Sequence, residues 1–269
     1  MKKVKGQTKI IAEKGACIKP YQSKNYDLAA LGALSLAMAV ALPVAVSAET
    51  TDARTQVWEI ARGGQLYDNW AKVAGKELPK ETHPAYPASG KKSAGDTWRC
   101  KECHGWDYKG VEGAYGKGSH KTGIKGLRAM VGTDPNAIIK VIKDGTHRYS
   151  NEMITPGDMQ KLALLVSLGQ IDDDLHIDRA TLKSRGEAGR GAAYFQTICA
   201  VCHGFDGKNM NFGTLAAPEF VGTIARENPW EFMHKARFGQ AGVPMISLSM
   251  LPDSTIADIL AYAQTLPEK

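Results

Sequence analysis

Two short motifs in this chain of 269 residues place a pair of cysteines directly before a histidine. They are Cys100-x-x-Cys103-His104 and Cys199-x-x-Cys202-His203. Within each motif the two thiols lie about one helical turn apart, so both can form thioether bonds to the vinyl groups of one porphyrin. The adjacent imidazole can then bind the iron from one side of the ring. The spacing therefore predicts two covalently attached haem c groups.

Two other uses of such cysteines fit the motifs less well. A zinc site takes four well-spread ligands, and a histidine directly after the second cysteine is poorly placed for the same ion. A redox-active Cys-x-x-Cys pair belongs in a βαβ unit, which the sequence pattern does not predict. Haem attachment is the interpretation that uses every residue of both motifs.

The sequence around the motifs repeats in the same order, which predicts two copies of one helical unit. The motifs themselves lie 99 residues apart. Asp134 and Asn228 each precede a proline that can open a helix, and Gly145 and Gly239 are expected to end those helices. Matched start and end residues at corresponding places favour a true internal repeat.

Each copy closes with a second amphipathic helix whose apolar residues recur at i, i+3, i+4 and i+7. These residues are Met159, Leu162, Ala163 and Val166 in the first copy and Ile256, Ile259, Leu260 and Ala263 in the second. We expect them to form a core and to take no part in chemistry. The charged stretch 172–186 has little apolar periodicity and is predicted to link the copies.

A helix leading into Cys-x-x-Cys-His, a middle helix, a ligand loop and a closing helix resemble the class I cytochrome c fold. Two such units resemble the dihaem cytochrome c4 type. The resemblance covers most of the chain from residue 93 onward, and it implies an all-α fold of two tandem class I domains, each wrapped around one covalently bound haem. It departs at residues 49–97, where a candidate first helix at 64–74 is followed by a proline-rich segment.

The N-terminus is predicted to be an export signal. Seven lysines precede an uncharged apolar run from Leu28 to Val46, and small residues up to Ala48 suit cleavage by a signal peptidase. An uncleaved membrane anchor is the alternative, since about 19 apolar residues can span a bilayer. Cleavage would remove seven lysines and two acidic residues, leaving 27 basic and 26 acidic residues. The basic pI of 8.9 therefore comes mostly from the targeting segment and gives no support to a nucleic-acid partner.

The expected organisation has five parts. They are a cleaved signal peptide at 1–48, an N-terminal extension of the first domain at 49–92, a first cytochrome c domain at 93–171, a linker at 172–186 and a second cytochrome c domain at 187–269. The signal peptide predicts a periplasmic location. Outside that peptide, every cysteine belongs to one of the two motifs.

The sixth iron ligand of the second unit is expected to be Met245. The glycine-rich approach from Gly239 and the spacing to the closing helix are similar to the methionine loop of class I cytochromes. Met250 and Met210 are the competing candidates. A thioether ligand stabilises ferrous iron and raises the reduction potential relative to a second imidazole.

The sixth ligand of the first unit depends on how the repeat is aligned. Counting forward from Gly145 leads to Asn151, next to Met153, whereas counting back from the last helix leads to His147. The next helix begins too soon after Met153 for a loop to cross the haem face, so His147 is preferred, Met153 is the alternative and His120 comes third. With His147 and Met245 as ligands, electrons would run from a low-potential first haem to a high-potential second haem.

Several other residues near the motifs could contact a porphyrin. Trp98, Trp106 and Tyr108 flank the first motif, and each is expected to be an ordinary core or rim residue unless it packs on the haem. Three further histidines lack a ligand pattern and are expected at the surface or in local hydrogen bonds: His83, His176 and His234.

The pattern favours an electron-transfer protein over an enzyme, because two six-coordinate haems leave no open iron. We expect a carrier between a donor, such as a dehydrogenase or a quinol-oxidising complex, and a terminal acceptor. It could equally be the cytochrome subunit of a redox complex, with residues 49–97 docking it to a membrane-associated partner. The alternative is a dihaem oxidoreductase acting on a sulfur compound or peroxide at the first haem. Dihaem thiosulfate dehydrogenases resemble this layout, but they use a cysteine ligand that the mature chain lacks.

Overall fold

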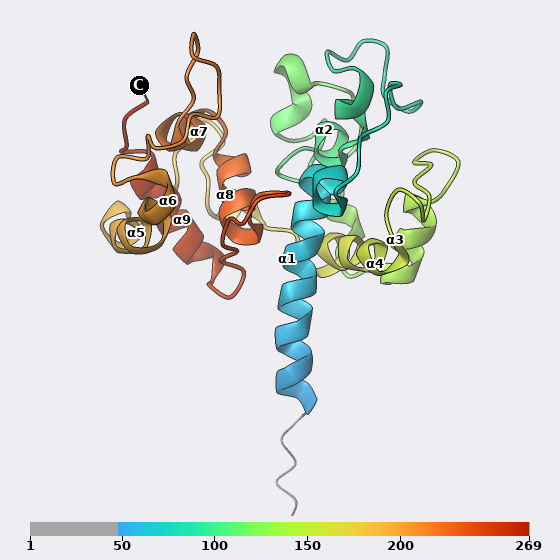
Figure 1. The fold of residues 1–269 in the computed structure, drawn as a ribbon, viewed down its shortest axis with the longest axis horizontal. Helices are drawn as coiled ribbons and strands as arrows, with labels where there is room; N and C mark the ends of the chain where they lie inside the picture. Colours follow the sequence, from blue (N-terminus) through green and yellow to red (C-terminus); the bar gives the residue numbers. More distant parts are fainter. Residues whose placement is uncertain (1–47, 269) are drawn as a thin grey trace, which may run out of the picture. The chain divides into compact units, whose positions relative to one another are not determined.

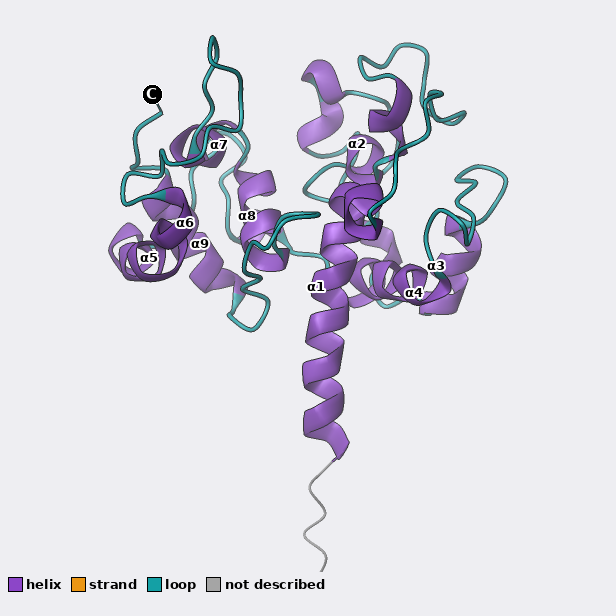
Figure 2. Cartoon of the chain, in the orientation of Figure 1, coloured by secondary structure: helices purple, strands orange, loops and turns teal. Residues whose placement is uncertain are grey.

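The computed structural model describes residues 48–268. These residues form helices joined by turns and loops, and they contain no β-strand beyond two isolated bridges (Figure 2). The expectation of an all-α fold is confirmed over this range. The predicted signal peptide lies outside the described residues, apart from Ala48 at its end. Between residues 48 and 268, no helix is long and apolar enough to cross a membrane.

The helices of the described residues follow one another along the chain as labelled in Figure 1. They are α1 (Ala48–Ala74), α2 (Cys100–His104), α3 (Pro135–Ile142), α4 (Pro156–Leu164), α5 (Ala188–Tyr194), α6 (Ala200–His203), α7 (Val221–Glu227), α8 (Pro229–Phe238) and α9 (Asp253–Ala263). Short 3₁₀ segments lie at Ala94–Trp98, Ala114–Gly116, Gly118–His120, Arg128–Met130 and Asp173–Leu175. Single π-helical turns extend α4 over Leu165–Gly169 and join α5 to α6 over Phe195–Cys199.

The long helix α1 packs against both α4 and α8 (Figure 1). Two consecutive glycines permit this close approach. A Cβ atom on Gly63 would lie 2.2 Å from the carbonyl oxygen of Lys161 in α4, and one on Gly64 would lie 2.3 Å from the ring of Phe238 in α8. The predicted helix at 64–74 is confirmed in part: it lies at the end of α1, but the non-helical backbone of Asn69 (φ −157°, ψ 89°) kinks the helix within this range.

The same packing device recurs where α5 crosses α9. A Cβ atom on Gly191 would lie only 1.9 Å from the carbonyl oxygen of Asp258. The order of an opening helix, a motif helix, a middle helix and a closing helix is therefore found twice, as α1 to α4 and as α5, α6, α8 and α9, with α7 added in the second case. In both, a glycine without a side chain lets the opening and closing helices touch.

The two middle helices begin where the sequence predicts. The Asp134 carboxylate accepts a hydrogen bond from the Asn136 amide at the start of α3. The Asn228 side chain accepts one from the Glu231 amide at the start of α8. Each helix has proline at its first position, where no amide hydrogen is needed.

Of the ends predicted for the two middle helices, one is confirmed and one is wrong. Gly239 follows α8 with φ +86°, so the expectation for the second copy is confirmed. For the first copy it is wrong, because α3 ends at Ile142 rather than at Gly145. The Asp144 side chain accepts backbone hydrogen bonds from the residues that follow it and turns the chain before the glycine is reached.

Most of the larger helices contribute to one core. Its cluster of buried side chains includes residues of α1, α4, α7, α8 and α9, and a smaller cluster joins Ile138 of α3 to Ala163 and Val166. All eight periodic residues predicted for the closing helices are buried. Their prediction as core residues is confirmed, and the burial of several large aliphatic side chains supplies the main stabilisation.

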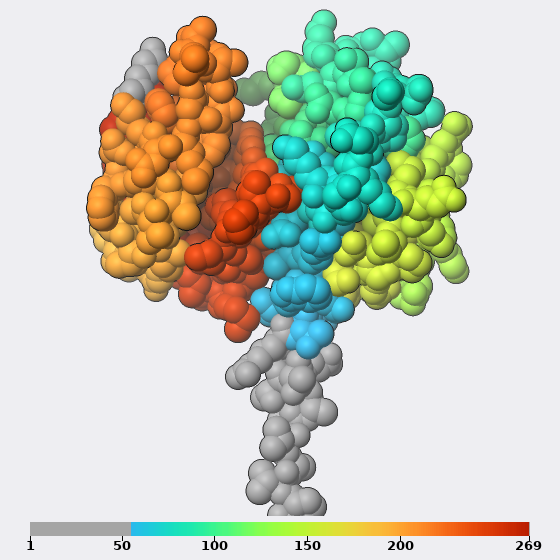
Figure 3. Space-filling model, viewed as in Figure 1, coloured from blue at the N-terminus to red at the C-terminus, as the bar shows by residue number. Residues whose placement is uncertain are grey.

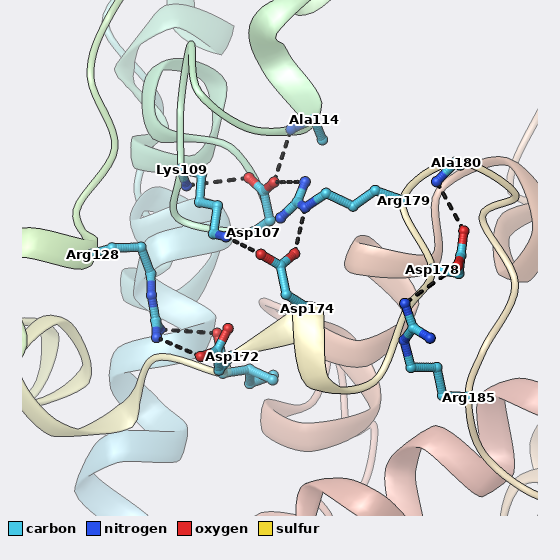
Figure 4. A network of polar contacts seen from close by, with 11 residues as sticks. Asp107, Lys109, Ala114, Arg128, Asp172, Asp174, Asp178, Arg179, Ala180 and Arg185 are labelled. Atoms are coloured by element: carbon cyan, nitrogen blue, oxygen red, sulfur yellow. Dashed lines mark hydrogen bonds and ion pairs between the residues drawn. The ribbon is translucent and has the colours of Figure 1, made fainter.

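The predicted linker is held in place by charged contacts (Figure 4). Its Arg179 donates a 2.8 Å hydrogen bond to Asp107, which lies three residues after the first motif. Arg179 also pairs with Asp174, which in turn pairs with Lys109. Ile177 in the same segment is almost fully buried. The first half of the segment is thus packed against the first unit, and its second half is bonded to α9, where Ser184 Oγ donates to the carbonyl oxygen of Ala257 at 2.6 Å.

Candidate haem-binding sites

The thiols of the first motif lie on α2 and form no disulfide. Cys100 and Cys103 are both free thiols. Burial raises the pKa of each to about 12, so both remain protonated at neutral pH. Such thiols are poor metal ligands or nucleophiles as they stand. Over the described part of the chain, no cluster of three or more His, Cys, Asp or Glu side chains could hold a metal ion, so the zinc interpretation gains no support.

The histidine of the first motif presents one ring nitrogen for ligation. His104 Nδ1 donates to the carbonyl oxygen of Lys125 at 2.8 Å, which fixes the tautomer and leaves Nε2 unprotonated. Burial is the main cause that lowers its pKa to about 4. His104 is therefore a neutral imidazole with its Nε2 lone pair available.

The ring of His147 lies opposite the ring of His104. The two ring centroids lie 6.2 Å apart, and the ring planes differ by 23°. His147 Nδ1 donates to the Asp144 carboxylate at 3.2 Å, which leaves Nε2 as the ring nitrogen not used in this hydrogen bond. Two metal–nitrogen bonds of about 2 Å each, plus the two rings, put the centroids of opposed imidazole ligands roughly 6 Å apart. The pair fits a bis-histidine iron site.

The loop that presents His147 is a well-formed turn. Asp144 Oδ1 accepts hydrogen bonds from the amides of Thr146 and His147, both at 2.8 Å. These bonds lower the pKa of Asp144 and keep it ionised. Arg148 then adopts φ +59°, an uncommon conformation for a residue with a side chain. The turn fixes His147 at its tip.

The two alternative ligands of the first unit have other contacts. Met153 is partly buried against the core, and its amide bonds to the preceding turn just before α4 begins at Pro156. His120 Nδ1 lies 3.1 Å from Glu102, and its ring stacks on Tyr115 at 4.6 Å. Of the candidates named from sequence, His147 is the one that the structure brings opposite His104.

The second motif is arranged more openly. Cys199 lies in the π turn that joins α5 to α6, and burial raises its pKa to about 11, whereas Cys202 is exposed. His203 is partly buried, and this burial lowers its pKa. Its Nδ1 atom is buried and lacks a hydrogen-bond partner. The ring of Phe212 lies 5.9 Å away. His203 Nδ1 thus lacks the backbone acceptor that His104 Nδ1 has.

Met245 lies on the loop that follows α8. The loop leaves the helix through Gly239. The segment after α8 lies against α1 (Figure 3), where a Cβ atom on Gly242 would lie 2.9 Å from Lys72 Cβ. At the end of α8, Gln65 Nε2 donates to the carbonyl oxygen of Phe238 at 3.0 Å. The Met245 side chain is partly exposed. His147 and Met245 stand at closely similar distances in sequence from the starts of α4 and α9. The role of Met245 as an iron ligand stays a prediction.

His234 is not at the surface, and that expectation is wrong. It is fully buried where α8 meets α1. Tyr108 Oη donates to its Nδ1 at 2.8 Å, and its Nε2 donates to the carbonyl oxygen of Gly64 at 2.9 Å. Burial is the main cause that lowers its pKa to about 4. The pattern of α8 alone could not predict this burial, because the cover comes from α1, more than 150 residues earlier in the chain.

His83 makes the expected local hydrogen bond, since the Ala85 amide donates to its Nδ1 at 3.1 Å, but it is buried beside the first motif rather than at the surface. Its ring lies 4.3 Å from that of Trp98. Trp98 Nε1 donates to the carbonyl oxygen of Glu81, and its own carbonyl accepts from Tyr149 Oη at 2.7 Å. Sequence reasoning missed His83, although its place in a segment that departs from the class I pattern was a usable signal.

The outer faces of the two motif helices differ sharply in exposure. Glu102 and Trp106 are each 2% exposed, and the ammonium group of Lys235 from α8 lies 5.5 Å from the Trp106 ring. At the corresponding positions in the second unit, Val201 is 79% and Phe205 is 75% exposed. The first motif helix is enclosed by the rest of the protein, and the second is open.

The arrangement has the donor set of a haem c protein. Each motif offers two free thiols for thioether bonds and one imidazole for the iron. The first adds a second imidazole on the facing loop. The residues therefore fit covalently held haem at the first motif in full, and at the second motif on the proximal side.

Comparison with known proteins supports this chemistry. Residues 186–262 match the family model described as "Cytochrome C oxidase, cbb3-type, subunit III". A relative from Synechocystis sp. named "Cytochrome c-553-like" is 34% identical over 85 residues, which is 32% of this chain and 74% of the relative. No solved structure matches the chain. The family model covers the second motif and leaves the first outside the matched range.

Proposed function

Because the chain belongs to the c-type cytochromes, we propose that it is an exported electron carrier with two covalently bound haems of unequal potential. Haem c and electron transfer are shared by this family. The observation that carries the proposal is the opposed pair of imidazoles, His104 and His147, whose ring centroids lie 6.2 Å apart beside two free thiols. That geometry supports a haem site in the unit that the family model does not cover.

The two motifs have the same basic task. Their cysteines anchor the porphyrin through thioether bonds, and His104 and His203 bind the iron through Nε2. When bound, haem c supplies a one-electron Fe(III)/Fe(II) couple. The protein supplies burial, ligand choice and a fixed ring orientation, which together tune the potential.

The distal ligands make the two sites unequal. His147 completes a bis-histidine site in the first unit, and Met245 completes a histidine–methionine site in the second. Imidazole favours ferric iron more than a thioether does, so the first site has the lower potential. Electrons accordingly flow from the first unit to the second. Because His147 closes the first site, that site does not bind a small substrate.

The second unit is the better place for a redox partner to dock. Its motif helix exposes Val201 and Phe205, whereas the corresponding face of the first unit is covered by α8. A partly apolar, uncovered surface beside a haem allows a partner to approach without unfolding anything. The donor is a dehydrogenase or quinol-oxidising complex, and the acceptor is a second redox protein. The N-terminal lysines and apolar run direct the chain to the periplasm.

The proposal is tested on the purified holoprotein. Pyridine haemochrome analysis should give two haems per chain. The near-infrared spectrum of the ferric form should contain a methionine–iron band from one haem only. A potentiometric titration should resolve two one-electron steps, with the bis-histidine haem at the lower potential.

Three results would contradict it. A measured content of one haem per chain would contradict haem binding at the first motif. Two equal high potentials would remove the bis-histidine assignment. A high-spin ferric haem that turns over peroxide or a sulfur compound would favour the oxidoreductase alternative, because such turnover needs an open iron.

A further inference from the structure

One segment of the first unit has no counterpart in the second. In the second unit, α5 runs through a single π turn directly into α6. In the first unit, residues 75–99 separate α1 from α2 and include three prolines. We call residues 79–98 the strap. The second unit shows that the arrangement of helices does not need this segment. Because the segment is nevertheless packed against the first unit, we looked for its function there.

The strap is bonded to the loop that carries His147. His83 Nε2 lies 2.8 Å from the carbonyl oxygen of His147. The tautomer follows from the other ring nitrogen, because the Ala85 amide donates to His83 Nδ1 at 3.1 Å. Nδ1 is therefore unprotonated, and Nε2–H donates to His147. The bond joins residues 64 positions apart in the chain.

The donor itself is held firmly. The His83 amide donates to Thr97 Oγ1 at 2.8 Å, which closes the strap upon itself. The His83 ring packs edge-on to Trp98 and lies 6.0 Å from the ring of Tyr149. Tyr149 follows His147 by two residues and is itself buried. The strap thus contacts the loop at its backbone and at its one buried aromatic residue.

The loop needs such a support. The residues on either side of His147 are exposed, and its turn is held by hydrogen bonds to the exposed carboxylate of Asp144. Segments with few buried contacts open locally at small free-energy cost. A ligand on a mobile loop leaves the iron more often than one whose backbone is fixed by packed neighbours.

We propose that His83 is a positioning residue, which holds the backbone of His147 so that its imidazole stays on the iron of the first haem. The inference rests on the proposed function, because it takes His147 as the distal ligand. It gives the strap a purpose: it closes the first site against exogenous ligands. The second unit has no such strap.

The test compares substitutions that separate the two hydrogen bonds of the His83 ring. In H83N, the short amide can still accept from the Ala85 amide but cannot reach the carbonyl oxygen of His147. In H83Q, the longer amide retains a donor at that reach and loses the acceptor. Y86F is the matched control, because it removes the acceptor for the Lys92 amide within the strap and does not touch the His147 loop. H83F keeps an aromatic ring against Trp98 and serves if H83N fails to fold.

Carbon monoxide binding to the ferrous holoprotein is the readout, together with the ferric low-spin spectrum. H83N and H83F should increase the CO-reactive fraction at least fivefold, whereas H83Q and Y86F should stay within twofold of the wild type. Folded H83N and H83F with unchanged CO exclusion would overturn the role of His83 and leave His147 ligation intact. A wild-type protein without a bis-histidine spectrum would overturn both.

Discussion

The two units that carry a Cys-x-x-Cys-His motif share an order of helices but differ in their surroundings. The motif helix of the first unit is covered by α8, and Trp106 and Glu102 on it are buried. The motif helix of the second unit exposes Val201 and Phe205 at the same positions. Identical attachment chemistry is therefore compatible with an enclosed site and an open one.

The histidines of the two motifs also differ in the hydrogen bonding of their Nδ1 atoms. His104 Nδ1 has a backbone acceptor, and an opposed imidazole lies across from it. His203 Nδ1 is buried without a partner. The first site is therefore organised by more protein contacts, including the strap, than the second.

The largest effect is expected from removing one attachment site at a time. C100A/C103A and C199A/C202A should each reduce covalent haem from two groups to one, measured as pyridine haemochrome per chain. The first double variant should melt at the lower temperature, because its haem is enclosed by the joint core. Equal melting temperatures would break the contrast between an enclosed and an open site.

A second comparison uses the paired aromatic residues. W106A should lower the free energy of unfolding by about 3–5 kcal/mol, because it leaves a cavity under α8. F205A should change it by less than about 0.5 kcal/mol, because this side chain is mostly exposed. Denaturant titration of the holoproteins measures both. F205A should instead slow electron exchange with a partner; normal exchange in F205A would argue against docking at this face.

Exchanging the distal ligands should move the two potentials in opposite directions. H147M should raise the potential of the first haem and M245H should lower that of the second, each by on the order of 100 mV within the roughly 0.8 V that axial ligands span. Potentiometric titration with optical detection measures the shifts. M153L is the control. A shift in M153L with none in H147M would make Met153 the ligand.

The smallest predicted effect concerns acid stability at the contact between α8 and α1. The folded-state pKa of His234 is lowered from 6.5 to about 4. Between these values the unfolded chain binds a proton that the folded protein does not, so the free energy of unfolding falls as the pH falls, by about 1.4 kcal/mol per pH unit from this group.

Denaturant titrations at pH 7, 5.5 and 4.5 check this slope. H234Q has no histidine at this position to take up a proton. Its free energy of unfolding should therefore fall less steeply with falling pH than that of the wild type, by about 1.4 kcal/mol per pH unit between the two pKa values. H176Q, at a partly exposed histidine, should keep the wild-type slope. Parallel slopes for the wild type and H234Q would show that His234 is not held neutral in the fold.

Much of the fold was accessible to sequence reasoning because its signals are local. Helix starts at Asp134 and Asn228 follow from capping residues next to proline, and the core positions of the closing helices follow from their periodicity. The end of α3 was predicted wrongly. The Asp144 side chain accepts backbone hydrogen bonds that turn the chain before Gly145, the residue that was expected to end the helix. His147 was preferred on loop length alone, and the structure adds its partner ring and the state of its nitrogens.

The amino-acid order determined the attachment chemistry, since two thiols and an imidazole within five residues need no distant partner to define them. It also determined the helical elements, whose caps and periodicity act over a few residues. The enclosure of α2, the burial of His234 and the bond from His83 to the His147 loop depended on segments that are tens of residues apart in sequence. Such contacts are fixed by how the helices pack, so only the folded chain reveals that two similar motifs occupy unlike environments.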